Sequence, residues 1–158
     1  MSFAEIGAAA PLFSLQNQDG DEVNLQDFAG KKTVVLYFYP KALTPGCTTQ
    51  ACGLRDSREL LEQKNVVVFG ISPDPVKKLQ QFIEKHSLNF DLLSDEDHAI
   101  AEQYGVWGLK KFMGREYMGI MRVTFVIDQD LKVMAVLDKF KTGNHHDVLM
   151  ETLEENGI

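Results

Sequence analysis

The chain has 158 residues, of which 44% are hydrophobic and 25% charged, an average composition for one globular domain. The 16 Lys and Arg against 23 Asp and Glu give a net charge of −7, and consecutive cations occur at most in pairs, so no nucleic-acid partner is expected. The longest apolar runs fall far short of the ~20 residues that a membrane span needs, and no signal peptide is recognisable. We therefore expect a single domain over residues 1–158, a cytoplasmic location and no membrane partner.

Strand and helix patterns alternate along the chain, which predicts an α/β fold with a mostly parallel central sheet. Segments 13–16 and 22–25 flank the turn residues Asp19 and Gly20 and predict an N-terminal β-hairpin. Continuous β-branched and aromatic runs predict two strands that are buried on both faces, at 33–39 and 65–72. Apolar residues at helical spacing, and the proline-rich start of the second segment, predict helices at 47–63 and 75–83.

In the second half, similar signals predict a short strand, a short helix, a second hairpin and a final helix capped by Asn144. These elements are expected at 89–93, 98–104, 120–127 with 131–137, and 145–153. Residues 106–119 are punctuated by glycine and are expected to form an irregular surface loop. Trp107 and Phe112, in this loop, either cover the core or form an apolar collar near a site.

None of the four histidines stands at a spacing typical of metal ligands. His145 and His146 are adjacent at the predicted start of the last helix, so their side chains diverge by about 100° and cannot share a metal ion. We expect both of them to be exposed.

Cys47 and Cys52 are the two cysteines of the sequence. They do not make a disulfide framework, and C-x4-C lacks the second ligand pair of a zinc site, so neither a metal nor another cofactor is expected. Cys47 follows a buried strand and a Pro/Gly loop and falls at the start of a helix, where unpaired N–H groups and the helix dipole favour a thiolate. Thr44 is close enough in sequence for its hydroxyl to reach the same pocket. The alternative is that the cysteines, Cys52 above all, are inert core residues.

The spacing of the two cysteines has a geometric consequence. Residues five apart in a regular helix have Cα atoms ~8.7 Å apart, whereas a disulfide requires less than ~7 Å. Cys47 and Cys52 can therefore join only if the helix unwinds, and Gly53 weakens the helix at this point.

Segment 38–48 (FYPKALTPGCT) resembles the P-x-x-x-T-x-x-C signature of peroxiredoxins, most closely that of the bacterioferritin comigratory protein or peroxiredoxin Q subfamily. Similarity continues in register over most of the chain, including segments 51–56, 93–95, 104–108 and 122–128. The resemblance implies a thioredoxin-like fold, with a central mixed β-sheet flanked by helices, an N-terminal β-hairpin, and reduction of hydroperoxides without metal or haem.

The resemblance also implies a role for each cysteine. Cys47 matches the peroxidatic cysteine, which peroxide oxidises to a sulfenic acid. Cys52 matches the resolving cysteine, which condenses with Cys47 to an intramolecular disulfide. Thioredoxin or a similar dithiol would then reduce the disulfide, as part of antioxidant defence. Members of the subfamily are often monomers, although a dimer is also compatible with the sequence.

Four further residues match positions of the family's pocket. Pro40 would shield the thiolate, Thr44 and Arg122 would complete the peroxide pocket, and Gln50 would orient the arginine. Strand alternation places Arg122, Thr124 and Val126 on one face. Without the resemblance, Arg122 would be interpreted as half of a surface ion pair.

Two other functions are compatible with a reactive cysteine pair. A thiol–disulfide oxidoreductase would be oxidised by protein disulfides faster than by peroxide, and a redox sensor or holdase would be oxidised once, slowly, without turnover. Arg122 discriminates, because a peroxidase needs its charge and the other two do not.

Overall fold

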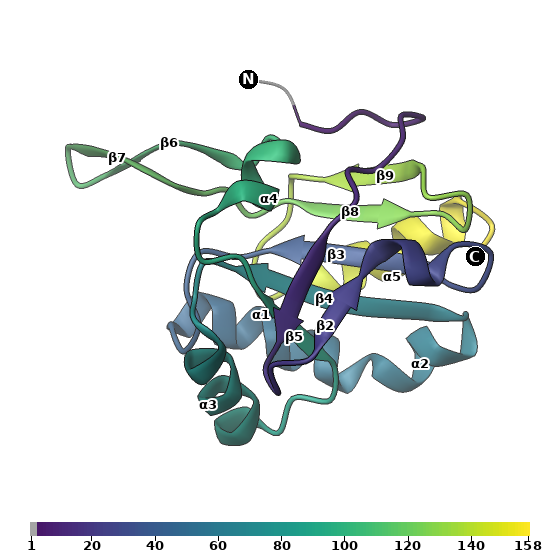
Figure 1. Ribbon diagram of the computed structural model, residues 1–158, viewed down its shortest axis with the longest axis horizontal. Helices are drawn as coiled ribbons and strands as arrows, with labels where there is room; N and C mark the ends of the chain where they lie inside the picture. The colour runs from purple at the N-terminus through teal and green to yellow at the C-terminus, as the bar shows by residue number, and fades with distance from the viewer. Residues whose placement is uncertain (1–2) are drawn as a thin grey trace.

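Seven strands form one sheet in the order β2-β1-β5-β4-β3-β8-β9 in the computed structural model, which describes residues 3–158 (Figure 1). Their bounds are β1 Ser14–Asn17, β2 Glu22–Asn24, β3 Thr33–Phe38, β4 Val66–Ser72, β5 Asp91–Ser94, β8 Thr124–Ile127 and β9 Val133–Leu137. The pairings β3–β4 and β4–β5 are parallel, and the other four are antiparallel. The expected mixed sheet and N-terminal hairpin are confirmed. The expectation of a mostly parallel sheet is wrong, because a hairpin adds antiparallel strands at each edge.

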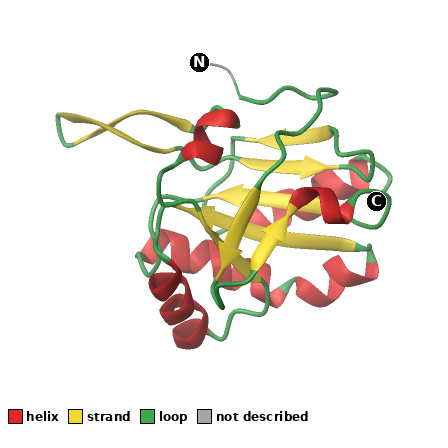
Figure 2. Cartoon of the chain, viewed as in Figure 1, coloured by secondary structure: helices red, strands yellow, loops and turns green. Residues whose placement is uncertain are grey.

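Helices pack on both faces of the sheet (Figure 2). Their bounds are α1 Pro45–Asp56, α2 Arg58–Gln63, α3 Val76–His86, α4 Ala99–Gln103, α5 His145–Glu155 and the 3₁₀ helix Leu25–Phe28. The predicted helix 47–63 is thus divided at Ser57 into α1 and α2. Asn144 precedes α5 but does not cap it as expected, since its side-chain oxygen accepts from the Lys141 N–H instead (2.8 Å).

The central strand β3 is buried on both faces, as its sequence predicts. One set of its side chains joins an apolar cluster with α4 and the N-terminal segment. The alternate set joins a second cluster with α1, α2, α3 and α5, and Cys47 belongs to this second cluster. Within residues 3–158 no helix is long and apolar enough to cross a membrane.

The segment expected to be an irregular loop is a β-hairpin that projects from the rest of the molecule (Figure 1). Its strands, β6 Trp107–Phe112 and β7 Arg115–Ile120, pair with each other and form a sheet separate from the seven-stranded one. Met113 and Gly114 join them, both with positive φ (52° and 79°), which is the geometry of a two-residue type I′ turn. The sequence did not predict this turn because methionine rarely adopts positive φ.

Candidate active site

Cys47 is the third residue of α1 and lies directly behind the carboxyl end of β3. The strand ends, a loop of six residues turns back, and the helix begins at Pro45, whose missing N–H costs nothing in a first turn. The Cys47 side chain is only 1% exposed. Its sulfur therefore lies near the amino end of α1, where the helix dipole stabilises negative charge.

Arg122 reaches this sulfur from the short segment between β7 and β8. Pairing of Tyr37 with Thr124, and the bond from the Phe38 N–H to the Val123 carbonyl (3.0 Å), place Arg122 beside the end of β3. Its Nη2 lies 3.2 Å from Cys47 Sγ. The guanidinium is a permanent cation, and a charge-assisted hydrogen bond of this kind stabilises the thiolate.

Gln50 is a hydrogen-bond partner of this arginine. Arg122 Nη1 donates to Gln50 Oε1 over 2.9 Å, and the Gln50 side chain is fully buried one turn after Cys47. Gly46 leaves room for the guanidinium, because a Cβ at that position would lie 3.1 Å from Arg122 Nη2. The structure thus brings together three of the predicted residues, Cys47, Gln50 and Arg122.

Thr44 and Pro40 lie in the loop that leads to Cys47. The Thr44 hydroxyl donates to the Lys41 carbonyl (2.8 Å), so its lone pairs, and not its proton, are free to face a substrate. Pro40 is half-buried at the end of β3. The shielding role of Pro40 and the contact of Thr44 with peroxide stay predictions.

Asp74 holds the loop in place and was not recognised as a site residue in the sequence. Its carboxylate accepts from the Ala42 N–H (2.7 Å) and from the buried Ser72 hydroxyl (2.8 Å). β4 runs parallel to β3, so residues after β4 come to the same edge of the sheet as the cysteine loop. That topology, with a carboxylate directly after a buried strand, was the signal available in the sequence.

Cys52 lies in the same helix as Cys47, and both are free thiols. Cys52 is half-buried, and the next residue, Gly53, packs against the ring of His146 from the start of α5. A Cβ at position 53 would collide with that ring. The intact helix keeps the cysteines apart, as the spacing predicts.

His145 is fully buried, so the expectation that it is exposed is wrong. Its Nε2 lies 2.8 Å from the Thr124 hydroxyl, in the layer beneath the site. Burial, with smaller contributions from His146 and Arg122, lowers the pKa of His145 to about 3. The first turn of α5 lies directly against the sheet, a tertiary contact that the polar sequence around His145 did not predict. His146 is half-buried.

The β6–β7 hairpin reaches the edge of the site at its base. Lys110 Nζ donates to the Ile120 carbonyl (2.9 Å), two residues before Arg122. Burial and the nearby Arg122 charge lower the pKa of Lys110. Trp107 stacks on His98 (ring centroids 3.8 Å apart) and packs against the core, which agrees with the core-covering interpretation, whereas Phe112 is exposed.

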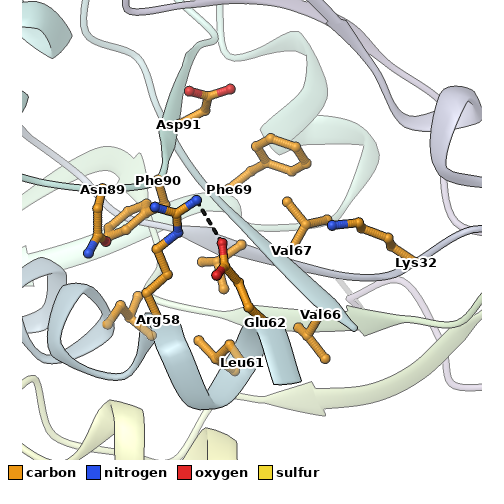
Figure 3. Close-up of a pocket in the computed structure, with 12 residues that line it drawn as sticks. Lys32, Arg58, Leu61, Glu62, Val66, Val67, Phe69, Asn89, Phe90 and Asp91 are labelled. Atoms are coloured by element: carbon orange, nitrogen blue, oxygen red, sulfur yellow. Dashed lines mark ion pairs between the residues drawn. The ribbon is translucent and has the colours of Figure 1, made fainter. Parts of the chain in front are cut away.

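A hollow elsewhere on the surface contains none of the predicted site residues (Figure 3). It lies between α2, the first half of β4 and the residues before β5, with an apolar floor and the ion pair Arg58–Glu62 (2.8 Å) at its rim. Charges of both signs line it, so it favours no particular ligand. Among residues 3–158, no cluster of three or more His, Cys, Asp or Glu side chains could hold a metal ion.

Solved structures with this fold show the class of protein. Peroxidoxin BcpB from Mycobacterium tuberculosis superposes with a TM-score of 0.85 at 37% identity, covering 96% of this chain and 97% of its own. A mutant form of PrxQ from Xylella fastidiosa superposes over the whole of both chains with a TM-score of 0.92 at 27% identity. The fold is therefore that of the thioredoxin-like peroxiredoxins, as expected.

Sequence relatives narrow this class to a family. The AhpC/TSA family matches residues 6–136. Peroxiredoxin Bcp of Escherichia coli (strain K12) is 56% identical over 156 residues, which is 99% of each chain, and peroxiredoxin Bcp of Bacillus subtilis (strain 168) is 46% identical over 96% of each. The chain belongs to the AhpC/TSA family and is a Bcp/PrxQ-type peroxiredoxin, a thiol peroxidase.

Proposed function

We propose that this peroxiredoxin reduces hydrogen peroxide and organic hydroperoxides through a Cys47 sulfenic acid and a Cys47–Cys52 disulfide. The observation that carries the proposal is the 3.2 Å contact between Cys47 Sγ and Arg122 Nη2 at the amino end of α1. A structural cysteine in a core would not need a half-buried guanidinium beside it.

In the first step, the Cys47 thiolate attacks the terminal oxygen of ROOH in line with the O–O bond. The S–O bond forms as the O–O bond breaks, so sulfur loses two electrons and the peroxide gains them. The oxygen that leaves as RO⁻ takes a proton from solvent and departs as ROH. Arg122 stabilises the charge as it moves from sulfur to oxygen, and the Thr44 hydroxyl accepts a hydrogen bond from the attacked OH.

In the second step, the Cys52 thiolate attacks the sulfur of the Cys47 sulfenic acid. The S–S bond forms, the S–O bond breaks, and the oxygen leaves as water after taking up a proton. Because both residues lie in α1, this step requires the first turns of α1 to unwind and the contact between Gly53 and His146 to open. The free thiols and the closed helix correspond to the reduced state of the cycle.

An external dithiol, thioredoxin or a similar protein, then reduces the disulfide by thiol exchange and restores the cycle. A reducing compartment such as the cytoplasm would supply it, and the cycle would serve antioxidant defence. One relative of known structure, from Xanthomonas campestris, is described by its alkyl peroxide reduction activity, which supports organic hydroperoxides as substrates here. The site as described is built from one chain, which is compatible with a monomer.

The test is intact mass after rapid mixing of the reduced protein with equimolar hydrogen peroxide, with quenching at a series of times. We expect loss of two hydrogens with a rate constant above ~10⁴ M⁻¹s⁻¹, the low end for efficient enzymes. Cys52→Ser should stop at a gain of one oxygen, and Cys47→Ser should not react. Slow oxidation by peroxide with fast oxidation by a protein disulfide would instead indicate an electron carrier, and a single slow oxidation would indicate a sensor.

A further inference from the structure

The β6–β7 hairpin exposes apolar side chains that neither the core nor the active site uses. Phe112 is 66% exposed and Met113, in the turn, is 87% exposed. Leu109, Tyr117 and Met118 are exposed as well. An isolated two-stranded ribbon is only marginally stable in water, and clustered exposed apolar residues usually mark a binding surface.

These apolar side chains lie on both faces of the ribbon. Residues paired across antiparallel strands point to the same face. The pair Leu109–Met118 therefore lies on one face, whereas Tyr117 and Phe112, two register positions apart, lie on the other. A protein groove that covered one face would leave the other face in water, whereas a fluid phase can surround the tip from all sides.

The hairpin also differs in charge from the rest of the chain. Residues 107–120 contain three cations and one anion, a net charge of +2, while the whole chain carries −7. Lys111 and Arg115 are exposed next to the apolar tip, Lys111 beside Glu116 at 3.5 Å. Two such hairpins would repel each other, whereas an anionic surface attracts the cations of the hairpin and repels the acidic remainder.

We propose that the tip of the β6–β7 hairpin binds the surface of anionic phospholipid bilayers, with Phe112 and Met113 among the lipid chains and Lys111 and Arg115 at the headgroups. An apolar tip with flanking cations is what an interface of headgroups and hydrocarbon accommodates. The sequence-based expectation of no membrane partner rested on the lack of a spanning segment, and peripheral binding does not need one. Ile120, at the base of the hairpin, accepts a hydrogen bond from Lys110 and precedes Arg122 by two residues, so bound protein would hold its thiol site on the side of the molecule that faces the bilayer.

The test is co-sedimentation of the full chain with large unilamellar vesicles of equal parts phosphatidylglycerol and phosphatidylcholine, compared with phosphatidylcholine alone. We expect binding to the anionic vesicles, reduced at least about fivefold by F112S/M113S and about threefold by K111Q/R115Q or by high salt. The matched control is L12S/L60S, which removes two side chains that are each 53% exposed on the body of the protein and should bind like wild type. The emission of an indole introduced by Phe112→Trp should shift to shorter wavelength with anionic vesicles.

Several outcomes would overturn the proposal. These are no binding of wild type to anionic vesicles, equal binding by F112S/M113S, or unshifted emission of the new indole. Dimers in sedimentation equilibrium that F112S/M113S dissociates would assign the hairpin to a second copy instead, and slower reduction of the oxidised F112S/M113S variant by a dithiol protein would assign it to the reductant. Cys47→Ser should bind vesicles like wild type and F112S/M113S should react normally with hydrogen peroxide, so the result is independent of the proposed catalytic cycle.

Discussion

In the proposed reaction, Arg122 is the residue on which the chemistry of Cys47 depends most directly. Its fork of donors is divided between two partners, Nη2 to the sulfur and Nη1 to Gln50. We therefore propose that Gln50 acts through Arg122 as a positioning residue. The same arrangement holds the arginine in one orientation, so we expect no reorganisation when the peroxide arrives.

We expect Arg122→Ala to lower the second-order rate of peroxide reduction at least about tenfold, because it removes the charge that stabilises both the thiolate and the leaving oxygen. Arg122→Lys should recover only part of the rate, since lysine cannot donate to sulfur and to Gln50 from one rigid fork. Stopped-flow measurement of the reduced variants gives the rates, with Arg58→Ala as a control that loses only the exposed ion pair to Glu62. An unchanged rate in a folded Arg122→Ala variant would remove this residue from the mechanism.

Gly46 offers a finer test of the same geometry. A methyl group at this position would lie 3.1 Å from Arg122 Nη2 and 3.6 Å from Thr142 Cγ2, so Gly46→Ala displaces the guanidinium by a few tenths of an ångström. We expect peroxide reduction to slow about three- to tenfold, while the unfolding free energy changes by less than about 1 kcal/mol. Gly143→Ala is the matched control, since its methyl group would meet nothing within 4 Å. Equal rates in the two variants would contradict a role for the close approach at Gly46.

At the scale of elements, the proposed cycle gives α1 two incompatible tasks. As a helix it presents Cys47 to Arg122, and as an unwound segment it would let Cys52 reach Cys47. Its contact with α5, where the ring of His146 lies on Gly53, favours the helix. The glycine itself favours unwinding, by roughly 0.5–1 kcal/mol relative to alanine.

These two influences of position 53 can be separated by a double-mutant cycle. In the wild-type background, Gly53→Ala collides with His146 and should lower the unfolding free energy by about 1–3 kcal/mol. In a His146→Ala background the collision is gone, so the same change should raise stability by ~0.5–1 kcal/mol and slow disulfide formation about two- to fivefold. Urea unfolding and the quenched mass series measure the two effects.

The opposite sign in the two backgrounds is the expected signature. If Gly53→Ala has the same effect on stability with and without His146, the packing of this ring does not constrain α1. If disulfide formation is unchanged where stability rises, unwinding of α1 does not limit that step.

At the scale of the whole molecule, His145 makes stability depend on pH. Burial lowers its pKa to about 3, while in the unfolded chain it titrates near ~6.5. Between these values the unfolded state binds one more proton than the folded state, so stability falls as the pH falls. The loss approaches about 1.4 kcal/mol per pH unit in the middle of this range.

We therefore expect His145→Gln to reduce the slope of the unfolding free energy against pH. Between pH 6 and 4 the reduction should correspond to nearly one bound proton. Urea unfolding at a series of pH values measures the slope. From pH 7.5 to 8.5 histidine is neutral in both states, so the difference between variant and wild type should be constant there. If variant and wild type lose stability with the same slope between pH 6 and 4, His145 is protonated in the folded protein.

The sequence predicted the elements of the central sheet because their patterns are long and unambiguous, as in β3 and β4. It predicted a reactive Cys47 from its position at the start of a helix, but Gln50 and Arg122 only through the resemblance, since Cys47 and Arg122 are 75 positions apart and local patterns do not report such contacts. Asp74 and His145 were missed for the same reason, because each is defined by a neighbour from a distant element. The β6–β7 hairpin was missed because its glycines are typical of a loop and its Met–Gly turn is not a common hairpin turn, although its two strands pair regularly.

The pairing of β3 with β8 also sets the order in which a newly made chain becomes reactive. Cys47 leaves the ribosome long before Arg122, and β8 cannot add to β3 until synthesis has passed residue 127. Until then the thiol lacks the guanidinium contact on which the proposed peroxide chemistry depends. We therefore expect the long sequence separation to delay peroxide chemistry until the fold is complete, so that an incomplete chain is not selectively oxidised at Cys47 during translation.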